Sequence, residues 1–136
     1  MTTYLLDSNT CIEYLRLGQK LLVTRRLSVT PYQEIATCTI VLAEFLYGAL
    51  RSANPTASWT QVLSFTGKFS SLPFDAHAAT DYADIKALLA SLGQLIGPND
   101  LMIAAIARSS GLTLVTHNTA EFSRVPGLQL EDWQIP

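Results

Sequence analysis

The sequence has little of what would place this chain outside the ordinary globular proteins. Only 2 of its 136 residues are cysteine, so no framework of several disulfides can hold it together. Charged residues make up 15% of the chain and the formal net charge is -2. No run of about 18 apolar residues is present. Composition therefore argues against disorder, a membrane-spanning helix and nucleic-acid binding through a broadly basic surface.

The start of the sequence also lacks a recognisable secretory signal, because residues 1–7 contain neither a basic stretch nor a long apolar one. The two cysteines, Cys11 and Cys38, match no metal-binding or redox spacing and have apolar neighbours. We expect both to be small buried residues. Together these features lead us to expect a cytoplasmic protein with no membrane association.

What the sequence does contain is a pattern of alternating strands and helices. Hydrophobic residues make up 49% of the chain, enough for a core in one domain spanning residues 1–136. Alternation and turn residues predict strands at 3–6, 35–40, 112–116 and 128–130, with a weaker one at 71–74. Helical periodicity predicts helices at 11–17, 41–50, 58–69, 75–93 and 101–109. This order favours an α/β fold, a three-layer α/β/α sandwich with a mainly parallel central sheet.

Three acidic residues stand out because each is alone in an apolar stretch. Asp7, Glu44 and Asp100 have no Lys or Arg three or four residues away, so none can form an ion pair along its own helix. The predicted elements put Asp7 after the first strand, Glu44 soon after the second, and Asp100 in the first turn of a helix. In a parallel sheet these positions share the carboxyl edge, where ligands bind. Three converging carboxylates would suit a hard divalent cation such as Mg²⁺ or Mn²⁺, which in turn would meet phosphate.

Each acid also has a purely structural interpretation. Asp7 precedes a predicted helix and could cap it, and Asp100 follows Pro98 and Asn99 in a similar position. Glu44 has no capping role, because it lies beside the expected buried face of its helix; its structural alternative is a place on a solvated face. Asp75 is equally isolated, but it begins a helix and we interpret it as a cap.

The same residues fall within longer motifs that resemble a known family. Four motifs occur in order along nearly the whole chain: Leu-Leu-Asp-Ser-Asn at 5–9, Val-Leu-Ala-Glu-Phe-Leu-Tyr-Gly at 41–48, Gly-Pro-Asn-Asp-Leu-Met-Ile-Ala-Ala at 97–105, and Leu-Val-Thr-His-Asn-Thr-Ala-Glu-Phe at 114–122. In these motifs the sequence resembles the PIN-domain ribonucleases, specifically VapC-type toxins.

The resemblance implies a metal-dependent endoribonuclease that is inhibited by a VapB-type antitoxin and forms a homodimer. Asp7, Glu44 and Asp100 match the acidic positions of the family, and Ser8 and Thr116 match hydroxyl residues at the rim of its site. A further acidic position is replaced here by Asn118, which weakens a second metal site. We therefore expect Asn118 to support the first, with Glu121 as an outer substitute for the missing acid.

The expected reaction is hydrolysis of an RNA phosphodiester, with tRNA as the first substrate to test. Water activated by the cation attacks phosphorus in line, and the carboxylates place the ion and the water. His117 could act as a general acid or base, but a loop histidine is more often surface. Phosphate contacts would come from a few basic residues, for which the candidates are Arg16, Lys20, Arg25, Arg26 and Arg124.

Two other functions fit parts of the same pattern. A Mg²⁺-dependent phosphatase could use Asp7 as its nucleophile, although Asn9 stands where a second aspartate is usual. A catalytically weakened RNA-binding module of the same fold is also compatible, and Asn118 is its strongest argument. RNA cleavage compared with phosphomonoester hydrolysis, with and without a chelator, separates the three.

Overall fold

The computed structural model describes residues 1–17 and 22–135, and these form an α/β fold around one five-stranded sheet. All four strand pairings are parallel, and the strand order is β3-β2-β1-β4-β5. The strands are β1 (Tyr4–Leu6), β2 (Ile35–Cys38), β3 (Ser70–Leu72), β4 (Thr113–Val115) and β5 (Gln129–Glu131). The helices are α1 (Ser8–Leu17), α2 (Leu22–Val29), α3 (Thr39–Leu50), α4 (Pro55–Thr66), α5 (Ala76–Ser91), α6 (Pro98–Ser109) and α7 (Thr119–Phe122), with a 3-10 turn at Tyr32–Glu34. The predicted α/β class and parallel sheet are confirmed.

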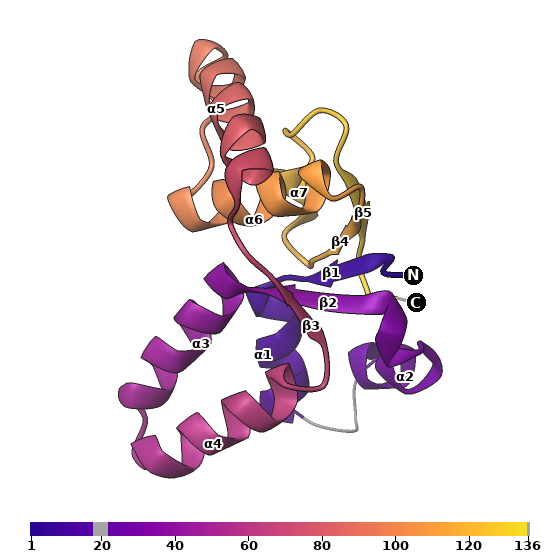
Figure 1. The fold of residues 1–136 in the computed structure, drawn as a ribbon, viewed down its shortest axis with the longest axis vertical. Coiled ribbons are helices and arrows are strands. Elements are labelled where there is room, and N and C mark those ends of the chain that lie inside the picture. Colours follow the sequence, from indigo (N-terminus) through magenta and orange to yellow (C-terminus); the bar gives the residue numbers. More distant parts are fainter. Residues whose placement is uncertain (18–21, 136) are drawn as a thin grey trace.

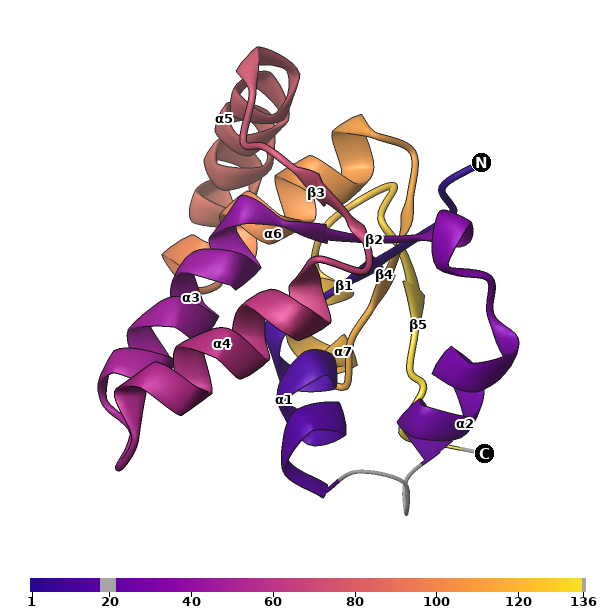
Figure 2. The same cartoon turned by 60° about the horizontal axis from the view of Figure 1, so that its bottom comes forward.

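Helices cover both faces of the sheet. Helices α5 and α6 pack on each other and lie on one side, with α1 and α2 on the other (Figures 1 and 2). Helices α3 and α4 form a second packed pair that projects from the sheet. The three predicted layers are therefore present, and the first strand of the chain is the central one.

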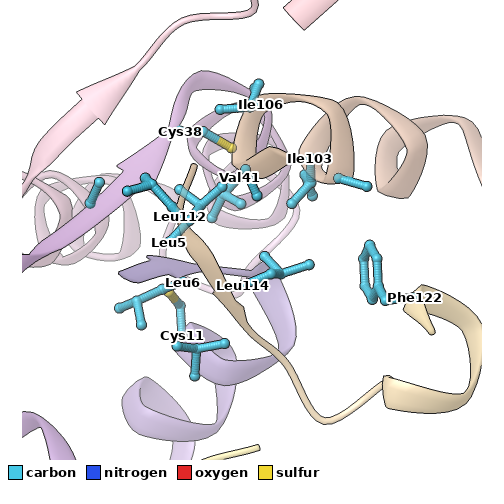
Figure 3. Close-up of a cluster of buried hydrophobic side chains, with 14 of the residues drawn as sticks. Leu5, Leu6, Cys11, Cys38, Val41, Ile103, Ile106, Leu112, Leu114 and Phe122 are labelled. Atoms are coloured by element: carbon cyan, nitrogen blue, oxygen red, sulfur yellow. The ribbon is translucent and has the colours of Figure 1, made fainter. Parts of the chain in front are cut away.

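The hydrophobic core stabilises the central strands β1 and β4. Leu5 and Leu6 of β1, Leu114 of β4 and Ile103 of α6 are fully buried in one hydrophobic core, and Leu6 lies on the same side of the sheet as Cys11 of α1 (Figure 3). Burying a leucine or isoleucine side chain stabilises the fold by about 1.5–3 kcal/mol, so these strands are held by their apolar side chains. Cys11 and Cys38 are buried free thiols, as predicted.

The register of the sheet brings distant parts of the chain to one edge. Leu6 pairs with Val115, and Val115 pairs with Glu131. Because all strands run in the same direction, the residues that follow Leu6, Cys38 and Val115 leave the sheet at its carboxyl edge. Asp7, Thr39 and Thr116 are these residues.

Two helices, α2 and α7, were not predicted, and four begin two or three residues earlier than predicted: α1, α3, α4 and α6. Helix α2 has an apolar face that was missed, with Val23 and Leu27 buried four residues apart, whereas α7 is a single turn and too short to show a period. Helix α4 begins at Pro55 rather than at residue 58, because Asn54 caps it: the side-chain oxygen of Asn54 accepts from the backbone N–H of Ala57 at 3.2 Å. Proline in the first helical position and an asparagine cap are typical of a helix start.

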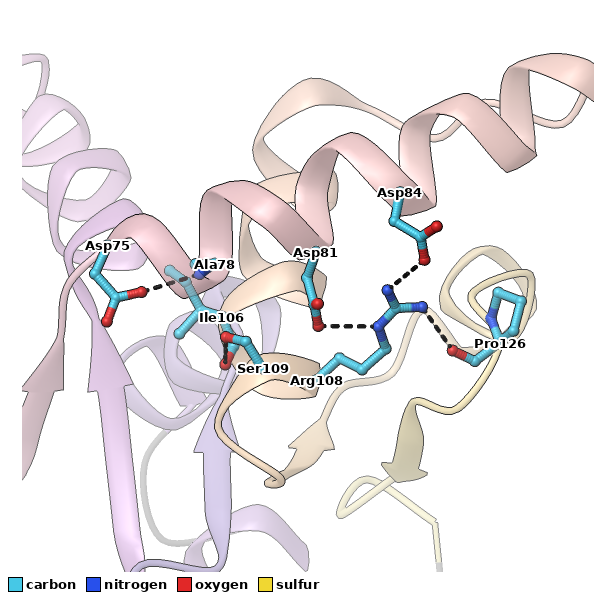
Figure 4. Close-up of polar contacts among 8 residues, drawn as sticks. All are labelled: Asp75, Ala78, Asp81, Asp84, Ile106, Arg108, Ser109 and Pro126. Carbon is cyan, nitrogen blue, oxygen red and sulfur yellow. Dashed lines mark hydrogen bonds and ion pairs between the residues drawn. The ribbon is translucent and has the colours of Figure 1, made fainter.

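A group of hydrogen bonds around Arg108, which we call the Arg108 clamp, joins three segments of the chain (Figure 4). Arg108 Nε donates to Asp81 at 3.0 Å, Nη2 donates to Asp84 at 2.9 Å, and Nη1 donates to the carbonyl of Pro126 at 3.1 Å. The side chain of Arg108 is 19% exposed. The clamp ties α5, α6 and the loop before β5 together, and α6 carries one of the three isolated acids.

Among the residues that the structure describes, no helix is both long and apolar enough to cross a membrane.

Candidate active site

Asp7 is held rigidly between the central strand and the first helix. It follows β1 and is 2% exposed. Its Oδ1 accepts from the backbone N–H of Thr10 at 3.0 Å, so Asp7 does cap α1, as its structural interpretation predicts. Its Oδ2 accepts from the hydroxyl of Thr116 at 2.5 Å, across 109 positions of sequence. Burial raises the pKa of Asp7, the hydrogen bonds from Thr10 and Thr116 oppose this, and Glu44 adds to it.

Glu44 lies in the second turn of α3 and carries an unsatisfied oxygen. Its Oε1 is buried and has no hydrogen-bond partner among the described residues. A buried carboxylate oxygen without a partner is costly, and folded proteins keep such groups mainly where a ligand or ion completes them. Two hollows of about 280 and 380 Å³ adjoin the side chain, and Asn99 of α6 lines the larger one. Glu44 therefore faces space between α3 and α6.

Asp100 lies in the first turn of α6 but does not cap it. The N-cap residue is Gly97, and no side chain makes a cap hydrogen bond there. The capping interpretation of Asp100 is therefore wrong. Its carboxylate accepts no hydrogen bond from the described residues. Its pKa is raised to about 6, chiefly by desolvation and then by the negative charges of Glu121, Asp7 and Glu44.

Because the charges of Glu121, Asp7 and Glu44 all act on Asp100, and that of Glu44 acts on Asp7, the three isolated acids and Glu121 lie in one region of negative charge. Asp7 and Asp100 each have a raised pKa to which Glu44 contributes. No three His, Cys, Asp or Glu side chains are grouped tightly enough to hold one ion in the conformation of the described residues. That the acids share one cation accordingly stays a prediction. Their chemistry does fit one, because the donors are carboxylate oxygens and Glu44 has one unused.

Asn118 and Glu121 form a linked pair beside Asp100. Asn118 Nδ2 donates to Glu121 Oε2 at 2.8 Å, and the backbone N–H of Gly97 donates to Glu121 Oε1 at 3.0 Å. The backbone N–H of Asn118 donates to Thr116 Oγ1 at 3.0 Å. The hydrogen bonds from Asn118 and Gly97 lower the pKa of Glu121. Thr116 is fully buried, so this network reaches from the surface to Asp7.

Two other predicted residues, Ser8 and His117, take no part in this hydrogen-bond network. Ser8 is half-buried in the first turn of α1, and its side chain forms no hydrogen bond with the described residues. His117 is 58% exposed, and its Nδ1 lies 2.9 Å from Asp132 Oδ2, so it pairs with the segment after β5.

The basic candidates are scattered. Arg26 pairs with Glu131 at 3.0 Å, and Arg124 donates to the carbonyls of Gln94 and Leu95. Arg25 is exposed on α2, whereas Lys20 and the side chain of Arg16 lie outside the described residues.

Sequence reasoning missed the backbone groups that hold the site in place. The amides of Thr10 and Gly97 position Asp7 and Glu121, and Thr10 Oγ1 also donates to the carbonyl of Val115 at 3.1 Å. Backbone amides leave no signal in the side-chain pattern. Thr10 could have been found, because a residue three positions after a capping aspartate supplies the amide that the cap accepts.

Comparison with known proteins identifies the family to which the chain belongs. Residues 4–128 match the PIN domain family. The chain is 38% identical to a "tRNA(fMet)-specific endonuclease VapC" of Shigella flexneri, over 98% of this chain and 99% of the relative. It is 36% identical to a "Ribonuclease VapC2" of Haemophilus influenzae, again over 98% and 99%. A VapBC complex from Salmonella typhimurium, solved bound to DNA, contains a chain with a TM-score of 0.93, 36% identity and coverage of 98% and 99%.

The chain therefore belongs to the PIN-domain family, and within that family to the VapC ribonucleases. The resemblance seen in the four sequence motifs is confirmed.

Proposed function

We propose that this chain is a divalent-metal-dependent endoribonuclease toxin that hydrolyses RNA phosphodiester bonds, with Asp7, Glu44 and Asp100 as the residues that hold the ion. The observation that supports this most directly is the unpartnered, buried oxygen of Glu44. Burial raises the pKa values of two further carboxylates, Asp7 and Asp100, and the negative charge of Glu44 adds to both shifts. A divalent cation would relieve all three unfavourable interactions at once.

Each protein residue has a separate task in this proposal. Asp7 is fixed by Thr10 and Thr116, so it offers a carboxylate whose position does not depend on substrate. Glu44 on α3 and Asp100 on α6 would supply the other carboxylates that hold the ion. When bound, the ion supplies a nucleophilic water at neutral pH and stabilises negative charge on the phosphate oxygens.

The finer assignments rest on the family. Mg²⁺ or Mn²⁺ fits an all-oxygen donor set. The substrate is tRNA, as the name of the Shigella flexneri relative states for that protein. A VapB-type antitoxin neutralises the enzyme, in line with the VapBC complex solved from Salmonella typhimurium. The homodimer is proposed from the family resemblance alone. An enzyme that cleaves tRNA acts in the cytoplasm. The whole of residues 1–136 forms one PIN domain, with Ser8 and Thr116 at the rim of the site.

The test is cleavage of tRNA by purified, antitoxin-free protein with Mn²⁺. The variants D7N and D100N keep the shape of each side chain and remove its charge, and each should lower cleavage at least about 100-fold because the ion is lost. The matched control is D84N, which removes an aspartate from the Arg108 clamp where the side chain is 75% exposed. Its cleavage should stay within about twofold of the wild type.

The same assay separates the rival functions. Excess EDTA should abolish cleavage by the wild type; cleavage that survives it would overturn the metal proposal. Binding of RNA without cleavage under all conditions would indicate a binding module. Hydrolysis of a phosphomonoester but not of tRNA would indicate a phosphatase, a role that the buried, doubly hydrogen-bonded Asp7 does not favour.

A further inference from the structure

We propose that Glu121 is a positioning residue rather than a metal ligand, and that with Asn118 it forms a hydrogen-bonded brace that fixes the Asp100-bearing start of α6 relative to Asp7. This inference rests on the proposed function for its consequence in catalysis. Its structural part stands on contacts alone and can be tested on protein without metal.

The brace is a continuous path of hydrogen bonds between two ends of the site. It begins at the N–H of Gly97, which donates to Glu121, and Glu121 accepts a second bond from Asn118. The backbone N–H of Asn118 then donates to Thr116, and the Thr116 hydroxyl donates to Asp7. Each bond is between 2.5 and 3.0 Å long. Each of these hydrogen bonds pairs one donor with one acceptor, so no two donors and no two acceptors face each other along the path.

The two oxygens of Glu121 are both used within this path. Oε1 accepts a hydrogen bond from the backbone N–H of Gly97, the N-cap residue of α6. Oε2 accepts a hydrogen bond from the side-chain N–H of Asn118. Hydrogen bonds from N–H donors to a carboxylate are stronger than those between neutral groups. A carboxylate is therefore suited to this position as an acceptor of two donors, independently of any ion.

A second contact, made just after α7, supports the brace. Arg124, three residues after Glu121, donates to the carbonyls of Gln94 and Leu95 at 3.4 and 3.2 Å. Helix α7 and the residues that follow it thus contact both carbonyl groups and an amide group of the segment that leads into α6. Asp100 lies three residues after Gly97, so its position follows from that of the segment.

The brace also explains why asparagine, and not an acid, stands at 118. An aspartate there could not donate to Glu121, and it would place two carboxylates in contact at the 2.8 Å now spanned by a hydrogen bond. Like charges at that distance repel, and one of them would have to move or take up a proton. Asn118 is a donor to Glu121, so the brace does not need the missing acid.

The first test is amide hydrogen exchange at Gly97 in metal-free protein. In E121A this amide loses its acceptor, and its exchange should accelerate by about 10- to 100-fold. In E121Q the side-chain oxygen still accepts from Gly97, and the side-chain amide of Asn118 can rotate to accept from the new donor, so protection should be kept. The control E34A removes an equal charge at the opposite edge of the sheet, before β2, and should leave Gly97 unchanged. Unchanged exchange in E121A would overturn the brace.

The second test compares Mn²⁺ affinity and tRNA cleavage in the same variants. A positioning role predicts that E121A loses about 10- to 100-fold in both, whereas E121Q stays within about fivefold of the wild type. If E121Q loses as much as E121A in Mn²⁺ affinity, Glu121 is a ligand and the proposal fails.

The third test exchanges the charge between the two positions. N118D should accelerate exchange at Gly97 and lower cleavage, and N118D/E121Q should restore both, because one donor again faces one carboxylate. A gain of Mn²⁺ affinity in N118D alone would instead place residue 118 at the ion and overturn the proposal. If no variant, the wild type included, cleaves RNA, the proposed function fails while the exchange at Gly97 still decides the brace.

Discussion

At the scale of single residues, the site contains carboxylates whose burial and mutual repulsion cost folding free energy. Glu44 keeps a buried oxygen without a partner, and Asp100 is desolvated among three other acids. Neither residue gains hydrogen bonds from the described chain that would offset this cost. Such groups persist where function needs them, and removing their charge stabilises the protein without the ligand.

Asp100 gives this cost a measurable pH dependence. Its pKa is raised to about 6 in the folded state from 3.8. Between these values the unfolded chain has released the proton that the folded chain still binds, so stability falls as pH rises through this window. Relative to D100N, metal-free wild type should therefore lose stability from about pH 4 to pH 6 and be the less stable of the two at pH 7. Urea unfolding of both proteins across this range measures the difference; a constant gap would contradict the raised pKa.

The three acids could be predicted from the sequence because a lone charge in an apolar stretch is visible without a structure. Their surroundings could not. Asp7 proved to be a cap and a hydrogen-bond partner of Thr116 at once, whereas Asp100, in a similar sequence setting, caps nothing. The difference lies in which amide reaches which oxygen, and side-chain patterns do not encode that.

At the scale of elements, the strongly periodic segments were predictable and the short ones were not. Helices α5 and α6 match their predicted positions within three residues, because α5 has apolar residues at helical spacing and α6 has a nearly continuous buried run from Leu101 to Ala107. Helix α7 is a single turn whose place is set by Glu121 and Arg124 contacting a segment about 25 to 30 positions earlier in the chain. Local sequence carries no trace of such contacts, so α7 could not be predicted although it carries half of the brace.

The Arg108 clamp is the element-scale contact whose loss should be easiest to measure. R108M keeps much of the apolar stem and removes the hydrogen bonds to Asp81, Asp84 and Pro126. We expect the free energy of unfolding to fall by about 1–3 kcal/mol, because a largely buried guanidinium loses charged partners that stay behind. R25M, on the exposed side of α2, should change it by less than about 0.5 kcal/mol. Urea denaturation compares the two, and equal effects would show that the clamp contributes nothing specific.

At the scale of the whole molecule, the parallel sheet turns sequence distance into spatial proximity. The strand order puts β1 in the centre, flanked by β2 and β4, so residues from the beginning, middle and end of the chain reach one edge. This is why the predicted fold class already leads to the expectation that the three acids lie at one edge of the sheet. It did not fix their separation, which depends on side-chain conformations.

A bound ion should stabilise the entire fold, because the site exists only in the folded state. With Mn²⁺ at about 100 times its dissociation constant, the gain is about 2.7 kcal/mol, and the melting temperature should rise by several degrees. D100N should show no such rise, and EDTA should reverse it in the wild type. A thermal melt with matched Mg²⁺, Mn²⁺ and EDTA samples is sufficient, and an equal shift in D100N would locate the ion elsewhere.

The bond between Thr116 and Asp7 has a consequence for how the protein is made. Its partners are 109 positions apart, and the brace continues to residue 121. A nascent chain on the ribosome therefore carries Asp7 from the start but cannot fix it until translation is nearly finished. The central strand must wait for β4 in the same way. For an enzyme that cleaves RNA, this order of assembly delays catalytic activity until the last stage of synthesis. A neutralising partner can already be present by then.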